Sequence, residues 1–145
     1  MHGACVALMA WGTYLETGHP EMDRQHQRLV ELINQLYLAP SLQGDQPTEL
    51  LVDFLDFVER HFQWEEALME QLHYQDQEQH RSTHNLKRLD LASLGRLYRT
   101  GDSGSIGDWM VSMHDWFISQ ILQEDRGLAA FLLKLEAEHP TLTPN

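Results

Sequence analysis

Apolar residues recur every three or four positions through four long stretches of this chain, which is the spacing of one buried face of an α-helix. The stretches cover about residues 21–39, 48–72, 77–99 and 105–125. Glycine and proline are dense in the intervals that separate the first two stretches and the last two, so these intervals are predicted to be loops. No segment alternates apolar and polar residues over the length of a strand. The pattern therefore predicts an all-α protein.

Four amphipathic helices joined by short loops favour an antiparallel up-down-up-down four-helix bundle. We assign the bundle to about residues 21–125, after an N-terminal arm at 1–20 and before a short C-terminal helix and tail at 126–145. Gly127 is expected to break the chain between the fourth helix and this tail. At 145 residues, the chain is predicted to be one domain, 1–145.

Composition narrows the range of partners. The formal net charge is −12 with only 10 Lys and Arg residues, which argues against nucleic acid or an anionic membrane as a partner. The single cysteine, Cys5, excludes an intramolecular disulfide and fits a reducing compartment. The first ten residues are mildly apolar but lack a basic region and are too short to span a bilayer. We therefore expect a cytoplasmic protein.

Ionisable side chains interrupt the apolar faces of all four predicted helices. They are His26 on the first, His61 and Glu65 on the second, His80 and His84 on the third, and Asp125 on the fourth. Residues four apart on a helix have Cβ atoms about 5–6 Å from each other, so each pair projects together into the core. A core cannot bury so many polar groups without a charge that satisfies them. Either pair alone is weak evidence, but the combination predicts a metal site, and imidazole with carboxylate suits iron, zinc or copper.

Four segments together resemble bacterial hemerythrin, and the resemblance extends from Trp11 to about Gly127. The segments are Met22 to Asn34, His61 to Met69, His80-x-x-x-His84, and Trp116 to Asp125. The resemblance implies a four-helix bundle with a non-haem di-iron centre that binds O2 reversibly at an open site on one iron.

The resemblance also implies a ligand set and a pair of cofactors. His26 and His61 would ligate one iron, and His80 and His84 the other. Glu65 and Asp125 would bridge the two ions together with an oxo or hydroxo group. The cofactors would be two non-haem iron ions that change between Fe2+ and Fe3+, with O2 or a small anion as the external ligand.

One position departs from the family pattern. The family has a histidine five residues before the bridging aspartate and four after a tryptophan, and here that position is Gln120. His114 lies six residues away, about 9 Å along the helix and on a different face, so it is a poor substitute. A carboxamide is a weak, neutral ligand, and we expect Gln120 to be a hydrogen-bonded core amide rather than a ligand. Open or water-filled positions are then predicted on both irons.

Open positions on both irons change the expected function. A carrier needs one open site and a dry, shielded pocket. We therefore expect an O2-binding or redox-sensing domain that regulates an output module outside this chain, with no catalytic turnover. The alternatives are an O2 storage or carrier protein, a di-iron oxidase, peroxidase or nitric-oxide-handling enzyme, and a structural bundle with adventitious zinc.

Four further residues are candidates for the lining of the ligand pocket. They are His19, Phe62, Met69 and Trp116. His19 follows Gly18 at a position where family members commonly have an aliphatic residue, so the resemblance predicts a more polar pocket mouth in this chain.

Overall fold

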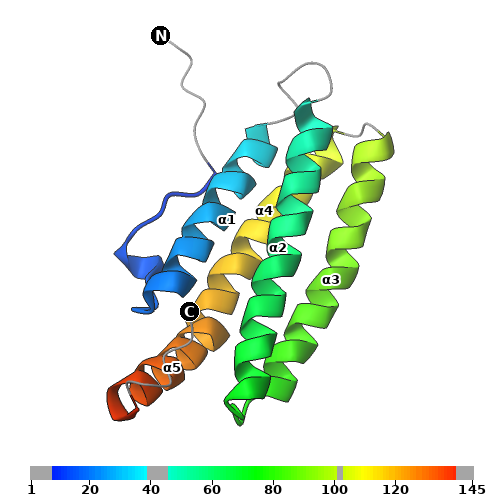
Figure 1. The fold of residues 1–145 in the computed structure, drawn as a ribbon. Helices are drawn as coiled ribbons and strands as arrows, with labels where there is room; N and C mark the ends of the chain where they lie inside the picture. Colours follow the sequence, from blue (N-terminus) through cyan, green and yellow to red (C-terminus); the bar gives the residue numbers. More distant parts are fainter. Residues whose placement is uncertain (1–7, 39–45, 101–102, 140–145) are drawn as a thin grey trace.

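The computed structural model describes residues 8–38, 46–100 and 103–139, and these residues form helices and connecting turns without any strand. The elements are the 3-10 turn Thr13–Leu15, α1 Pro20–Leu38, α2 Gln46–Gln71, α3 Gln77–Thr100, α4 Ser103–Gln120, the π turn Ile121–Asp125 and α5 Arg126–Glu138. Helices α1 to α4 run alternately up and down (Figure 1). The predicted all-α antiparallel bundle with a short C-terminal helix is confirmed.

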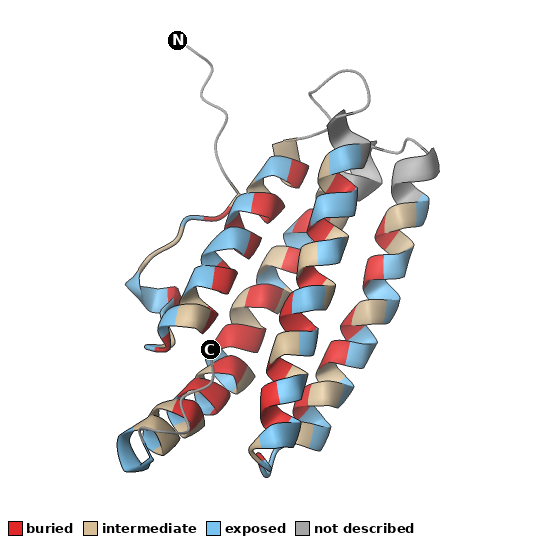
Figure 2. Ribbon diagram, viewed as in Figure 1, coloured by how far each residue is buried: buried red, intermediate tan, exposed pale blue. Residues whose placement is uncertain are grey.

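The four helices pack in a square. Helix α1 contacts α2 and α4, and α3 contacts the same two helices from the other side. Buried residues follow the sides on which the helices face one another, and exposed residues follow the outer sides (Figure 2). Because the outer sides are polar, no helix within the described residues combines the length and apolar composition needed to cross a bilayer.

Two apolar clusters fill the interior and leave a polar layer between them. The larger cluster includes Leu29, Phe62 and Phe117, and the smaller one includes Met22 and Met69. Helices α1 and α2 contribute to both clusters. Five of the six predicted ligands lie in the sequence between residues of the two clusters, and His61 directly precedes Phe62 of the larger one. The polar layer is therefore shielded from water along the length of the bundle.

The expected break at Gly127 is wrong. The chain passes from α4 through the π turn directly into α5, and Gly127 lies inside that helix. A single glycine costs a helix about 1 kcal/mol relative to alanine, and burial of Leu128, Ala129 and Leu132 in the smaller apolar cluster outweighs that cost. A Cβ atom at Gly127 would lie 3.2 Å from the Tyr74 hydroxyl, so the glycine allows Tyr74 to approach the backbone of α5.

Polar contacts attach the N-terminal arm to the bundle. The Asn34 side chain accepts from the Met9 N–H at 2.9 Å and donates to the Met9 carbonyl at 2.7 Å. The Asp23 carboxylate accepts from the backbone and hydroxyl of Thr17, both at 2.8 Å. Arg126 of α5 donates to backbone carbonyls of the arm. Cys5 lies outside the described residues.

Candidate metal centre

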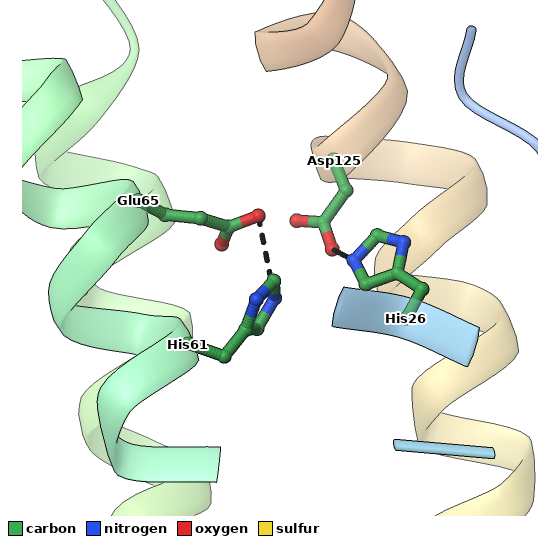
Figure 3. A group of neighbouring side chains, drawn as sticks. All are labelled: His26, His61, Glu65 and Asp125. Atoms are coloured by element: carbon green, nitrogen blue, oxygen red, sulfur yellow. Dashed lines mark ion pairs between the residues drawn. The ribbon is translucent and has the colours of Figure 1, made fainter. Parts of the chain in front are cut away.

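All six candidate ligands meet in the layer between the two apolar clusters. None of them is more than 3% exposed, so the site is shielded from bulk water. Figure 3 shows four of them, with the carboxylates of Glu65 and Asp125 directed toward each other, Glu65 next to His61 and Asp125 next to His26.

The ligands form two groups that share a carboxylate. In the first, His26, His61, Glu65 and Asp125 each place one ligand atom within 4.8 Å of the others. In the second, Glu65, His80 and His84 meet the same criterion. Each group has the size and chemistry to hold one metal ion.

Each carboxylate presents a different oxygen to each group. Glu65 Oε2 lies 3.4 Å from His61 Nε2, whereas Glu65 Oε1 lies 3.0 Å from His80 Nε2 and 3.1 Å from His84 Nε2. Asp125 Oδ2 lies 3.0 Å from His26 Nε2, and Asp125 Oδ1 lies 3.1 Å from His80 Nε2. This two-sided arrangement is the one that two carboxylates need to bridge a pair of ions.

Several buried atoms of this layer make no well-directed hydrogen bond among the described residues, although carboxylate oxygens lie close to some of them. These buried atoms are His26 Nε2, Glu65 Oε2, His84 Nε2 and Gln120 Oε1. Buried polar atoms are nearly always paired, and these nitrogen and oxygen atoms are ligands that a transition metal ion accepts. The residues present therefore fit a metal centre.

The electrostatics of the layer also favour a cation. Burial raises the pKa of Glu65, but His61, His80 and His84 together hold it well below its usual range. Burial and the nearby Glu65 carboxylate raise the pKa of Asp125 too, but the neighbouring imidazoles of His26 and His80 lower it overall. The layer thus contains two buried anionic carboxylates.

The pKa values of His61 and His80 are shifted in opposite directions. Burial lowers the pKa of His61 to about 4. Burial also acts to lower the pKa of His80, but its hydrogen bonds with Asp125 and Glu65 raise it to about 10. In the metal-free chain, His80 therefore carries a proton between the carboxylates, and a metal ion would bring its positive charge to the same place.

The outer nitrogens of three histidines face polar side chains that the sequence analysis did not identify. His61 Nδ1 lies 2.7 Å from Gln25 Oε1, and His84 Nδ1 lies 2.7 Å from Glu66 Oε2. His80 Nδ1 is 4.0 Å from Glu124 Oε1. The two hydrogen bonds keep Nε2 of His61 and His84 directed toward the centre, whereas the Glu124 carboxylate is too far from His80 for a hydrogen bond. The only signal in the sequence is adjacency, because Gln25, Glu66 and Glu124 each directly neighbour a candidate ligand.

The π turn explains how residues five apart share the centre. In a regular α-helix, Gln120 and Asp125 would point about 140° apart. Here the Arg126 N–H donates to the Ile121 carbonyl, five residues earlier, and the wider turn brings both side chains inward. Gln120 Nε2 donates to Asp125 Oδ1 at 3.3 Å and lies 3.5 Å from His80 Nε2.

A small apolar cavity ends at the polar layer. It offers about 10 Å³ to the centre of a water-sized molecule, enough for about one water molecule. Its lining consists of Leu29, Ile33, Val58, His61, Phe62, Met113, Trp116, Phe117, Gln120 and Asp125. A molecule in it would touch both an apolar wall and the layer of candidate ligands.

Comparison with known proteins settles the family. Residues 17–132 match the family model described as the hemerythrin HHE cation binding domain. The chain belongs to the hemerythrin family. Bacteriohemerythrin of Pseudomonas aeruginosa is 30% identical over 126 residues, which cover 84% of this chain and 80% of that protein. Bacteriohemerythrin of Stenotrophomonas maltophilia is 29% identical over 140 residues, covering 92% and 90%.

Solved hemerythrin structures have the same fold. A crystal structure of a hemerythrin point mutant superposes with a TM-score of 0.77 at 24% identity and covers 86% of this chain and 97% of that one. At this identity the likeness supports the fold alone. Membership of the hemerythrin family implies that the domain binds non-haem iron, and the cluster of histidines and carboxylates described above is the candidate site.

Two of the four candidate pocket residues of this hemerythrin domain line the cavity, and the other two lie elsewhere. Phe62 and Trp116 line the cavity, whereas Met69 lies in the smaller apolar cluster. His19 Nδ1 accepts from the Met22 N–H at 3.2 Å at the start of α1, and His19 Nε2 lies 3.7 Å from Glu136 of α5. The His19 ring meets Trp64 edge to face at 5.9 Å, and it is not among the residues that line the cavity.

Proposed function

We propose that this hemerythrin domain holds two iron ions and reports O2 or redox state to an output module outside the chain. His26 and His61 would hold one ion, His80 and His84 would hold the other, and Glu65 and Asp125 would offer one oxygen to each side. The bound irons supply O2 or small-anion binding and a change between the ferrous and ferric states. The sharing of Glu65 and Asp125 between two histidine pairs supports the two-ion part of the proposal.

The position of Gln120 is the observation that favours sensing over storage. Its amide lies beside His80 and Asp125, on the side where the family pattern has a third histidine. Its Nε2 already donates to Asp125, which leaves one neutral oxygen in place of an imidazole nitrogen. Each histidine pair then leaves room for an external ligand, and two exchangeable positions work against long retention of O2.

The residues around the centre determine which molecules reach it and how much water enters. The cavity wall of Leu29, Val58 and Phe117 is apolar and nearly closed, so it admits a small neutral molecule and disfavours bulk water. The Gln25 and Glu66 side chains hold His61 and His84 in orientation while the charge at the centre changes. The two imidazole rings are therefore expected to keep their orientation when the site changes its redox state.

Gln120→His tests the role of this position. The added imidazole is expected to fill a coordination position, so that the colour change on adding O2 to the reduced protein reverses when O2 is removed. The unchanged chain is expected to oxidise irreversibly, at least about 10-fold faster than the variant. Stopped-flow absorption with measurement of iron per chain gives both quantities, and Gln120→Leu, which offers no ligand atom, serves as the matched control.

Other outcomes of the same experiment identify the alternatives. A persistent, reversible change in the unchanged chain would indicate storage or transport of O2. Sustained consumption of peroxide or nitric oxide with a reductant would indicate an enzyme. A chain that retains zinc and no iron after expression in iron-supplied cells would contradict the proposal.

A further inference from the structure

We propose that Glu66 is a positioning residue that lets the His80 and His84 half of the centre keep its metal without a third histidine. The inference rests on the two-ion proposal above. It follows from a difference between the two halves of the centre in the side chains that lie near the outer nitrogen, Nδ1, of each histidine.

The outer partner of His84 is charged, whereas the outer partner of His61 is neutral. Both contacts are 2.7 Å long. Gln25 Nε2 donates to Glu21 Oε2 at 2.8 Å, which fixes the amide so that its oxygen accepts from His61. A carboxylate only accepts, so His84 Nδ1–H donates to Glu66. A hydrogen bond to a carboxylate is stronger than one to an amide and raises the basicity of the metal-binding nitrogen.

The outer nitrogens of the remaining two histidines also differ in whether a carboxylate lies near them. His80 Nδ1 faces the Glu124 carboxylate at 4.0 Å. His26 Nδ1 is buried and has no hydrogen-bond partner in the part of the chain that the structure describes. The half where Gln120 stands therefore has a carboxylate hydrogen-bonded to His84 and a second carboxylate 4.0 Å from His80, whereas the half with His26 and His61 has no carboxylate at these outer nitrogens.

Glu66 is itself held rigidly. Arg88 Nη1 donates to Glu66 Oε2 at 2.9 Å, and Arg88 also binds Glu59. The guanidinium carbon lies 5.2 Å from the centre of the Phe62 ring. Phe62 in turn stacks on His84 at 4.0 Å with an interplanar angle of 12°.

These contacts fix both the donor strength and the direction of His84. The ring is clamped between Phe62 on its face and Glu66 at its outer nitrogen, so that Nε2 points at Glu65 Oε1. A firmly oriented and strongly donating imidazole compensates for the weak carboxamide at position 120. The sequence places Glu66 next to the bridging Glu65, and the two carboxylates act on opposite sides of the same ring.

Glu66→Gln is the direct test, because it keeps the shape of the side chain and removes its charge. The metal-free chain is titrated anaerobically with Fe2+ against a chelator. One of the two ions is expected to bind about 10- to 100-fold more weakly, and the other without change. Glu70→Gln makes the same change at an exposed position on the same helix and is expected to leave both affinities as they are.

A double variant separates donor strength from structure. Adding Gln120→His to Glu66→Gln is expected to restore the weakened affinity, because it supplies the missing imidazole to the same ion. A merely structural defect would not be restored in this way. Thermal unfolding of the metal-free chains reports folding, and if Glu66→Gln does not fold, Glu66→Asp, which keeps the charge, is expected to show a smaller loss of affinity for the same ion.

The outcomes distinguish this inference from the proposed function. If the unchanged chain binds two irons and Glu66→Gln binds them as Glu70→Gln does, the inference is wrong and the two-ion proposal stands. Equal weakening of both ions also contradicts it. If the unchanged chain binds fewer than two irons, both fail.

Discussion

Glu65→Ala is expected to release both metal ions rather than one. Each oxygen of this carboxylate faces a different histidine pair, and the side chain is fully buried. Its loss removes one ligand from each ion and half of the buried negative charge that attracts them. We expect more than about 100-fold weaker binding at both positions, measured as iron per chain after exchange into metal-free buffer.

Glu70→Ala is the matched control for this prediction, because Glu70 lies on the same helix at an exposed position. It is expected to keep two irons per chain. If Glu65→Ala retained one tightly bound iron, Glu65 would serve a single ion and the two-sided arrangement of its oxygens would not be a bridge.

Phe62→Ala is expected to cost about 3–5 kcal/mol in the free energy of unfolding of the metal-free chain. Phe62 is 2% exposed and stacks on His84, contacts Arg88 and lines the cavity. The truncation leaves a larger hole beside the centre, and water that enters it should also speed oxidation of the iron. Urea unfolding gives the first quantity, and absorption after exposure to air gives the second.

Phe57→Ala provides the comparison on the same helix. Phe57 is only partly buried and packs at the edge of the larger apolar cluster, so its truncation should cost less than that of Phe62. Similar losses for the two variants would contradict the role given to Phe62, since its contacts with His84 and Arg88 would then contribute little.

The helical periodicity was enough to predict the bundle, because each helix buries one apolar stripe. The same periodicity placed His26, His61 and His80 on inner faces, and the structure brings them together. It failed at Gly127, where local propensity favours a break but the packing of α5 against the smaller apolar cluster decides. A glycine in the sequence does not reveal that Tyr74 lies against it.

The side chains that contact the outer nitrogens of His61 and His84 could not be predicted from the sequence. Gln25 and His61 lie on different helices, 36 positions apart, and so do Glu66 and His84, 18 positions apart. Only the packing of neighbouring helices brings such side chains within 2.7 Å. A partly exposed glutamate beside a buried one is otherwise typical of a solvated surface.

The π turn makes the length of one short segment more important than its composition. The side chains of Leu122 and Gln123 are exposed to solvent and do not belong to the buried layer of candidate ligands. The identity of these two residues should therefore matter little. Their number matters a great deal, because Asp125 reaches the centre only by being five positions beyond Gln120 along a widened turn. Substitutions at these two positions should therefore be tolerated. Deletion of either residue should not be, because it would rotate the Asp125 side chain by about 100° toward solvent.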